Sequence, residues 1–111
     1  MGLKTDLANA SSGKYLDDGG AWRLFVIDHI AAIQNTSRVV YPDATVIFKY
    51  RYDVRRYLRY NSVTEDLAWI FILINRLNSE RDFDVVQPYY VPIESEIDEL
   101  YHLYITTSQV T

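Results

Sequence analysis

The sequence contains no cysteine, which excludes disulfide bonds, thiolate metal sites and cysteine nucleophiles. No segment approaches the roughly 18–20 apolar residues that a membrane-spanning helix needs. The polar first twenty residues contain no apolar stretch that resembles a signal peptide. Internal repeats and low-complexity stretches are also missing. We therefore expect a soluble protein that is made in the cytosol and has no membrane partner.

The composition is that of an ordinary small globular domain. The chain has 111 residues, of which 49% are hydrophobic and 23% are charged, so one domain with one core is expected. The formal net charge of −4 gives no whole-chain signal for nucleic acid or anionic membrane. Ten tyrosines are present, and this residue type suits half-buried core positions and contacts between chains equally well.

Hydrophobic periodicity predicts the first elements. Apolar residues recur at three- and four-residue spacing over 21–34, which is typical of an amphipathic helix. In the stretch TVIFKYRY, 45–52, apolar and polar residues alternate, with Phe48 and Tyr52 on the apolar side. This alternation predicts a strand with one polar face.

Three further elements are expected after this strand. Asp53 is a good N-cap for a short helix, and Ser62 with Glu65 forms a capping box that starts a helix ending near Leu77. The stretch VVQPYYVPI is rich in β-formers, but its prolines confine it to the edge of a sheet. Acidic residues open a last helix over 94–104, where they favour the helix dipole, and the tail 105–111 could form a short strand.

The order strand, helix, helix, strand over 45–93 resembles the LysM module. The resemblance rests on YRYD in the opening strand, on NSVTEDLAWIFILINRL as the second helix with its terminal Asn, and on VQPYYVPI as the closing strand. It implies an α+β fold with a LysM-like β-α-α-β module at 45–93. An N-terminal arm and helix at 1–44 would precede this module, and a C-terminal helix and tail at 94–111 would follow it.

The resemblance also implies an alternative function, the binding of peptidoglycan or a related glycan. The two loops that form the sugar groove in LysM modules carry glycines, which let backbone groups approach a ligand closely. Here the first loop reads Asp-Val-Arg from Asp53, and Tyr89 follows the proline of the second loop. Under this alternative, Asp53, Tyr89 and Tyr90 would bind the glycan.

LysM-like folds that bind no sugar occur in phage tail baseplates, and the plan of this chain resembles the small wedge-type baseplate proteins. This resemblance implies a structural, non-enzymatic component of a virion that docks neighbouring subunits through the module and its helical arms. The chain would be made in the host cytoplasm and located in the virion tail. Its partners would be several structural proteins of the same assembly, with no nucleic acid or small molecule among them.

Catalytic constellations receive no support from the sequence. The only histidines are His29, which falls on the apolar face of the 21–34 helix, and His102. A hydrogen-bonded core histidine is the expected role of His29, and Asp82 and Asp84 are expected to be solvated. We therefore expect neither an enzyme nor a cofactor or metal site.

Charge is distributed unevenly along the chain. Five of the eleven basic residues fall within KYRYDVRRYLRY, 49–60, and four acids fall within 94–99. The two clusters could pair within the chain, could both be solvated and contribute little, or could meet opposite charges on other chains. The Arg/Tyr segment could also contact nucleic acid, but the overall acidity argues against this partner.

The helix expected over 63–77 is apolar on every side, and this is the strongest reason to expect a partner. Leu67, Ile70 and Ile74 can face the sheet, whereas the remaining large side chains need a second cover. Each one left in water forgoes roughly 1.5–3 kcal/mol. The cover would come from the 21–34 helix, from the 97–104 helix or from other subunits. The residues expected at contacts between chains are Arg55, Arg56, Tyr57, Arg59, Trp69, Phe71, Glu96 and Glu99.

Overall fold

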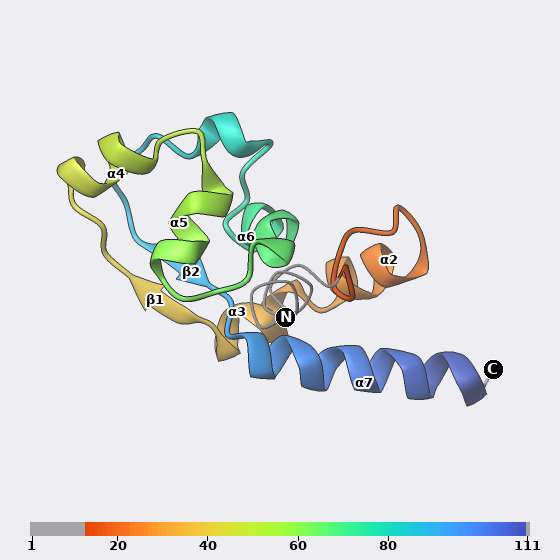
Figure 1. Cartoon of the computed structure of the whole chain (residues 1–111). Helices are drawn as coiled ribbons and strands as arrows, with labels where there is room; N and C mark the ends of the chain where they lie inside the picture. Colours follow the sequence, from red (N-terminus) through yellow and green to blue (C-terminus); the bar gives the residue numbers. More distant parts are fainter. Residues whose placement is uncertain (1–12, 111) are drawn as a thin grey trace, which may run out of the picture.

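The computed structural model describes residues 13–110 and has an α+β fold with one small antiparallel sheet (Figure 1). Strands β1 (Arg38–Val40) and β2 (Tyr89–Val91) pair so that Val39 lies opposite Tyr90. Between the strands the chain forms helices α4 (Ala44–Tyr50), α5 (Val54–Tyr60) and α6 (Ala68–Ile74), with short 3-10 turns at Glu65–Leu67 and Glu80–Asp82. Helices α2 (Ala21–Asp28) and α3 (Ile30–Thr36) precede the sheet, and α7 (Glu94–Val110) follows it.

The strand predicted over 45–52 is wrong, because this stretch forms helix α4. The Asp43 carboxylate accepts a hydrogen bond from the Val46 N–H and caps the helix. Ile47 and Tyr50, three residues apart, are buried, whereas Phe48 is 67% exposed. A strand would have buried Phe48 with Tyr50 on one face, so the burial follows the helical period instead.

The strand that pairs with β2 lies upstream of the predicted position, at Arg38–Val40. Ser37 ends α3 in extended conformation, and Pro42 follows the strand, so helix cannot extend across this segment in either direction. The pair of β-branched valines between these two breaks, Val39 and Val40, is a weak β signal. β2 itself lies between Pro88 and Pro92, inside the stretch predicted as an edge strand.

The predicted start of the central helix is corrected by one turn, whereas the predicted cap of α5 is confirmed. The Asp53 carboxylate accepts from the Arg56 N–H, as expected for an N-cap. Thr64, in place of the predicted Ser62–Glu65 box, accepts from the Asp66 N–H. Ser62 has a left-handed φ of 61°, and this places it outside the helix that it was expected to cap.

The central helix also ends earlier than Leu77. α6 stops at Ile74, and Arg76 adopts a left-handed φ of 57°, the conformation typical of a residue just past a helix end. The Asn75 side chain donates to the Tyr90 carbonyl at 2.9 Å and accepts from the Tyr90 N–H at 2.8 Å. The end of α6 is therefore tied to the middle of β2.

The flanking helices differ from the prediction in two places. The helix predicted over 21–34 is broken at His29 into α2 and α3, and the His29 Nδ1 lies 2.7 Å from the Phe25 carbonyl oxygen. The short strand suggested for 105–111 is wrong, because α7 continues to Val110. Thr111 lies outside the described residues.

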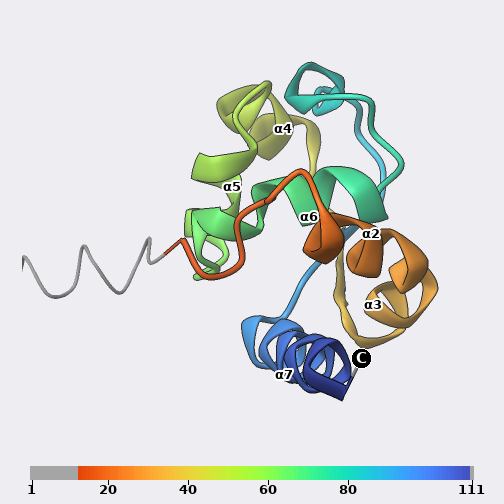
Figure 2. The same cartoon turned by 90° about the vertical axis from the view of Figure 1, so that its right-hand side faces the viewer.

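The apolar surface of α6 is covered within the chain on two sides. Phe71 packs against β2, where its ring centroid lies 5.8 Å from that of Tyr89, and against Tyr57 and Phe83. Trp69 meets Trp22 of α2 at a centroid distance of 6.3 Å. Figure 2 shows α6 between α4 and α5 on one side and α2, α3 and α7 on the other. One core therefore includes residues from the sheet, from α2 and α3 and from α7.

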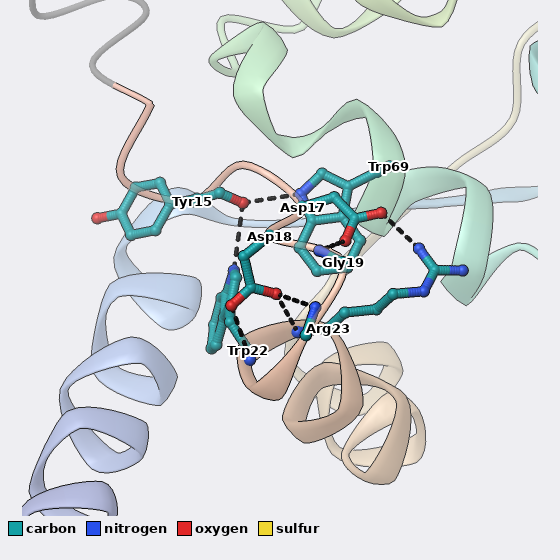
Figure 3. A network of polar contacts seen from close by, with 8 residues as sticks. Tyr15, Asp17, Asp18, Gly19, Trp22, Arg23 and Trp69 are labelled. Carbon is teal, nitrogen blue, oxygen red and sulfur yellow. Dashed lines mark hydrogen bonds and ion pairs between the residues drawn. The ribbon is translucent and has the colours of Figure 1, made fainter.

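The segment before α2 is fixed to this core by hydrogen bonds (Figure 3). The Tyr15 carbonyl accepts from the indole N–H groups of both Trp22 and Trp69. The Tyr15 hydroxyl donates to Asp98 of α7, and the Asp18 carboxylate accepts from backbone N–H groups at the start of α2. This segment was predicted as an irregular arm, and residues 13–20 form no helix or strand but are tied to α6 and α7 through Lys14 and Tyr15. The first twelve residues of that arm lie outside the described part of the chain.

The described molecule is flat, with extents of 47 × 39 × 22 Å. No helix among residues 13–110 combines the length and the hydrophobicity needed to cross a bilayer. In both overall views α4 lies on the side of the molecule away from α7 (Figures 1 and 2). The α4 part of the basic segment therefore lies away from the last helix, whereas the residues just after α5 line one hollow with Glu94.

Candidate functional site

The basic segment forms an exposed surface on α4, α5 and the turn between them. We define the aromatic–basic surface by its six exposed members, Phe48, Lys49, Arg51, Tyr52, Arg56 and Tyr60. Three of these are aromatic rings at least half exposed. Within the part of the chain that the structure describes, none of its three cations forms an ion pair. Aromatic and arginine side chains are the types that dominate the energetics of protein interfaces.

Cations and rings contact one another across this surface. The Arg51 guanidinium lies 4.4 Å from the Phe48 ring centroid and 5.5 Å from that of Tyr52. The Arg56 guanidinium lies 5.4 Å from the ring of Tyr50, and Tyr50 packs on Tyr60 at 5.0 Å. Such cation–π contacts hold long arginine side chains in place. The surface is therefore partly pre-organised, which reduces the entropy lost when a partner binds.

Tyr52 occupies an unfavourable backbone conformation on this surface. Its φ is 63°, and the left-handed region costs a residue with a Cβ roughly 1–2 kcal/mol. Its N–H donates to the Phe83 carbonyl at 3.0 Å, which fixes the turn. Half of the Tyr52 side chain is nevertheless exposed. The backbone of Tyr52 therefore serves the turn, while its half-exposed ring is available for contact with another chain.

The predicted contact residues of α5 divide between two sides of the helix. Arg56 belongs to the aromatic–basic surface, whereas Arg55 faces a hollow of about 550 Å³ that Trp69 also lines. Arg59 lies 3.7 Å from Glu65 in an exposed ion pair. Arg55 and Trp69 are thus brought together, away from Arg56.

Two predicted contact residues belong to the core. Tyr57 and Phe71 are both at most 2% exposed and pack on each other, and burial raises the pKa of the Tyr57 hydroxyl. Neither side chain can reach a partner in this fold. Phe48 and Tyr52 take that place on the surface, and the assignment of a strand hid them because it put both on the buried face. The helical spacing of Asp43, Ile47 and Tyr50 is the signal that would have exposed them.

The acidic residues of α7 border an open groove against α3. We define the acidic groove by its lining residues, Ala32, Ile33, Thr36, Glu96, Ile97, Glu99, Leu100 and Leu103. Its volume is about 260 Å³, and apolar side chains form most of its lining. The predicted contact residues Glu96 and Glu99 supply its only charges. Within residues 13–110 neither forms an ion pair, so the two charge clusters do not pair inside the chain.

Asp98, which lies between these two glutamates, is engaged within the chain. Its carboxylate lies 2.8 Å from the Lys14 Nζ and 3.4 Å from the His102 Nε2, and it also accepts from the Tyr15 hydroxyl. The hydrogen bond from Lys14, followed by that from Tyr15, lowers the pKa of Asp98. Burial, and then the bond to Asp98, raises the pKa of Tyr15. Asp98 therefore holds the N-terminal segment on α7 and is not available to the groove.

The residues expected for glycan binding do not come together as a site. The Asp53 carboxylate caps α5. Tyr89 is 1% exposed and its hydroxyl donates to the Val85 carbonyl, while burial raises its pKa. Tyr90 alone lies at an opening, a mostly polar hollow of about 440 Å³. The lining of this hollow comprises Gln34, Ile74, Asn75, Arg76, Gln87, Pro88 and Tyr90.

The histidines occupy positions that suit structural roles. His29 is half-buried, stacks on Phe25 at 4.2 Å and contacts a backbone carbonyl, while His102 is exposed beside Asp98. Within residues 13–110, no three His, Cys, Asp or Glu side chains gather as a metal site. Asp82 accepts from the Asn78 N–H, and Asp84 is exposed.

Two features of the geometry therefore stand out, the aromatic–basic surface on α4 and α5 and the acidic groove between α3 and α7. Comparison of the chain with protein-family models, with curated proteins and with solved structures gives no match.

Proposed function

We propose that this chain is a structural, non-enzymatic subunit that docks on a neighbouring chain through its aromatic–basic surface. The observation that carries the proposal is Tyr52, an exposed ring held in a left-handed turn among cations that form no ion pair in the described structure. Exposed aromatic rings are costly to leave in water, and aromatic and arginine side chains are the types enriched in interfaces.

The assembly that we propose is a virion, and the place within it is the tail baseplate. The LysM-like plan supports this setting, because an antiparallel strand pair flanks the packed helices α5 and α6. The order of elements in the structure differs from the predicted order strand, helix, helix, strand by one additional helix, α4. The opening strand correspondingly lies at Arg38–Val40 instead of 45–52.

A photo-crosslinking amino acid tests the docking surface. It would replace Tyr52 or Tyr60 in the full chain, with Leu24, a 62% exposed residue of α2, as the matched control position. The tagged chain would be expressed together with the products of its neighbouring genes, and particles would be purified on a density gradient. We expect crosslinks from positions 52 and 60 to one defined chain and none from position 24. Equal crosslinking from all three positions, or exclusion of the chain from particles, contradicts the proposal.

The polar hollow beside Tyr90 favours a second candidate, glycan binding. An aromatic ring with amide and guanidinium groups around it is a suitable surface for a sugar ring, and Arg76 and Gln87 are exposed there. Co-sedimentation with insoluble peptidoglycan tests this function, with Tyr90→Ala and Gln87→Ala as variants. Tyr89 is unsuitable as a control because it is a core residue. Saturable binding that both variants lose would favour the glycan, and equal sedimentation with and without peptidoglycan would exclude it.

A further inference from the structure

We propose that the neighbouring chain is a second copy of this protein, whose acidic groove receives the aromatic–basic surface. This inference rests on the proposed docking function and names its partner. The two surfaces lie on different helices, and α4 lies on the side away from α7 (Figures 1 and 2). One copy can therefore present its surface while its own groove stays open.

Charge complementarity selects this partner. The segment 44–60 carries five basic residues and one acid, whereas 94–110 carries four acids and no Lys or Arg. Three of those acids, Glu94, Glu96 and Glu99, form no ion pair within the described residues. Complementary charge fixes orientation and suppresses wrong partners.

The shapes of the two surfaces also correspond. The groove is lined by the buried side chains of Ile33 and Ile97 and by half-buried Leu100, and of its two glutamates Glu96 is half-buried and Glu99 is exposed. The aromatic–basic surface has projecting rings, Phe48 and Tyr52, with Arg51 stacked on both. A ring can enter the groove while the guanidinium meets a carboxylate, a charge-assisted bond stronger than a neutral one.

The contact joins two different surfaces, so it is heterologous. A complex of two copies keeps one free surface and one free groove, so the chain of subunits closes into a ring or continues as a fibre. A symmetric dimer would use both surfaces and stop at two copies. The mode of association therefore distinguishes this interface from an ordinary two-fold dimer.

Complementation between two variants tests the inference. Arg51→Ala/Arg56→Ala impairs the surface and keeps the groove, while Glu96→Gln/Glu99→Gln impairs the groove and keeps the surface. Arg38→Ala/Arg81→Ala removes two exposed arginines elsewhere and is the matched control. The average mass of each purified full chain would be measured by analytical ultracentrifugation over a range of protein concentrations at low salt.

We expect the wild type and the control to grow beyond the dimer as concentration rises. Each test variant alone should associate at least about tenfold more weakly, which corresponds to roughly 1.4 kcal/mol. An equimolar mixture of the two should form a dimer and no larger species, because it contains only one intact surface–groove pair. Far-UV circular dichroism would show that both variants are folded.

A wild type that stays monomeric at every concentration, or a mixture that stays monomeric, overturns the inference. The inference is also overturned if the average mass of the Glu96→Gln/Glu99→Gln variant rises with concentration as that of the wild type does. These results leave the docking function intact if the crosslinkers at positions 52 and 60 still trap a different chain. Loss of those crosslinks would instead contradict the proposed docking function itself.

Discussion

Single residues decide where the helices of this protein begin and end. Asp53 was predicted as a cap from its residue type and its place before VRRYLRY, and the structure confirms it. The prediction of Ser62 as the cap of the central helix was wrong, and Thr64, a hydroxyl of the same chemistry, caps it instead. The structure distinguishes them by backbone conformation, left-handed at Ser62 and extended at Thr64. Sequence alone does not report which of two adjacent hydroxyls has the dihedral angles of a cap.

The left-handed Tyr52 allows stability and docking to be separated by one substitution. Tyr52→Gly removes the strain of the turn, so we expect the free energy of unfolding to stay equal or to rise by up to about 1 kcal/mol. The same change removes an exposed ring and should weaken self-association. Urea denaturation and ultracentrifugation would measure the two effects.

Ser62→Gly is the matched control for this substitution, since Ser62 is also exposed with a left-handed φ of 61°. It should relieve strain in the same way and leave self-association unchanged. If Tyr52→Gly associates as well as Ser62→Gly does, the ring has no role in docking.

At the scale of elements, short apolar stretches were the least predictable part of the chain. In TVIFKYRY the alternation of four apolar positions matched a strand, but Asp43 upstream was available to start a helix. The distinction depended on Ile47, the one residue that broke the alternation and that the structure buries. Longer signals were more reliable, and the predicted helices over 21–34, 63–77 and 94–104 all correspond to helical segments.

Two alanine substitutions in α4 distinguish the helix from a strand. Ile47→Ala should lower the free energy of unfolding by about 2–4 kcal/mol, because it deletes buried methyl groups. Phe48→Ala should change it by less than about 1 kcal/mol, because the ring is largely exposed. Urea denaturation of both variants measures these changes. A larger loss for Phe48→Ala than for Ile47→Ala would contradict the helix.

The contact between the N-terminal segment and α7 should make the free energy of unfolding depend on pH in the acidic range. The pKa of Asp98 is lowered in the folded protein by its bonds from Lys14 and Tyr15. A group whose folded pKa is lowered stabilises the fold above its unfolded pKa, here 3.8, and loses this contribution as the pH falls through the folded pKa. We therefore expect the wild type to lose stability below that pH.

Asp98→Asn should be less stable than the wild type at neutral pH and should lose less stability on acidification. Asp84→Asn, at an exposed loop position, is the control and should follow the wild type. The urea midpoints at neutral pH and at a pH of about 3 would be compared for all three proteins. Parallel decreases in all three would show that Asp98 does not contribute to the acid sensitivity.

At the scale of the whole molecule, the sequence predicted that α6 needs two covers and that the flanking helices could supply the second. The structure uses α2 and α3 for this purpose, with Trp22 against Trp69 and α3 packed on α6, so the apolar run is covered without a partner. Among the features that remain exposed are the aromatic–basic surface on α4 and α5 and the glutamates of α7, which lie on different elements. The sequence showed both charge clusters, but only their arrangement in space shows that they do not neutralise each other.

Separation of charge makes association sensitive to ionic strength. Attraction between exposed charges weakens when the Debye length falls from about 10 Å at 0.1 M salt to about 3 Å at 1 M. We expect high salt to reduce the average mass of the wild type in ultracentrifugation, while the Arg51→Ala/Arg56→Ala variant stays small at both salt concentrations. Growth of the wild type that increases with salt would show that apolar contact, and not charge, drives assembly.

The carbonyl of Tyr15 gives the protein an intrinsic optical reporter. The two tryptophans of the chain both donate their indole N–H to this one oxygen, and they lie against each other. Tryptophan emission depends on the polarity around the indole, so the fluorescence of the whole protein reports on a single junction between the N-terminal segment, α2 and α6. Opening of that junction would shift the emission while the total helical circular dichroism signal persists, and the two spectra together would time the release of the segment without any added label.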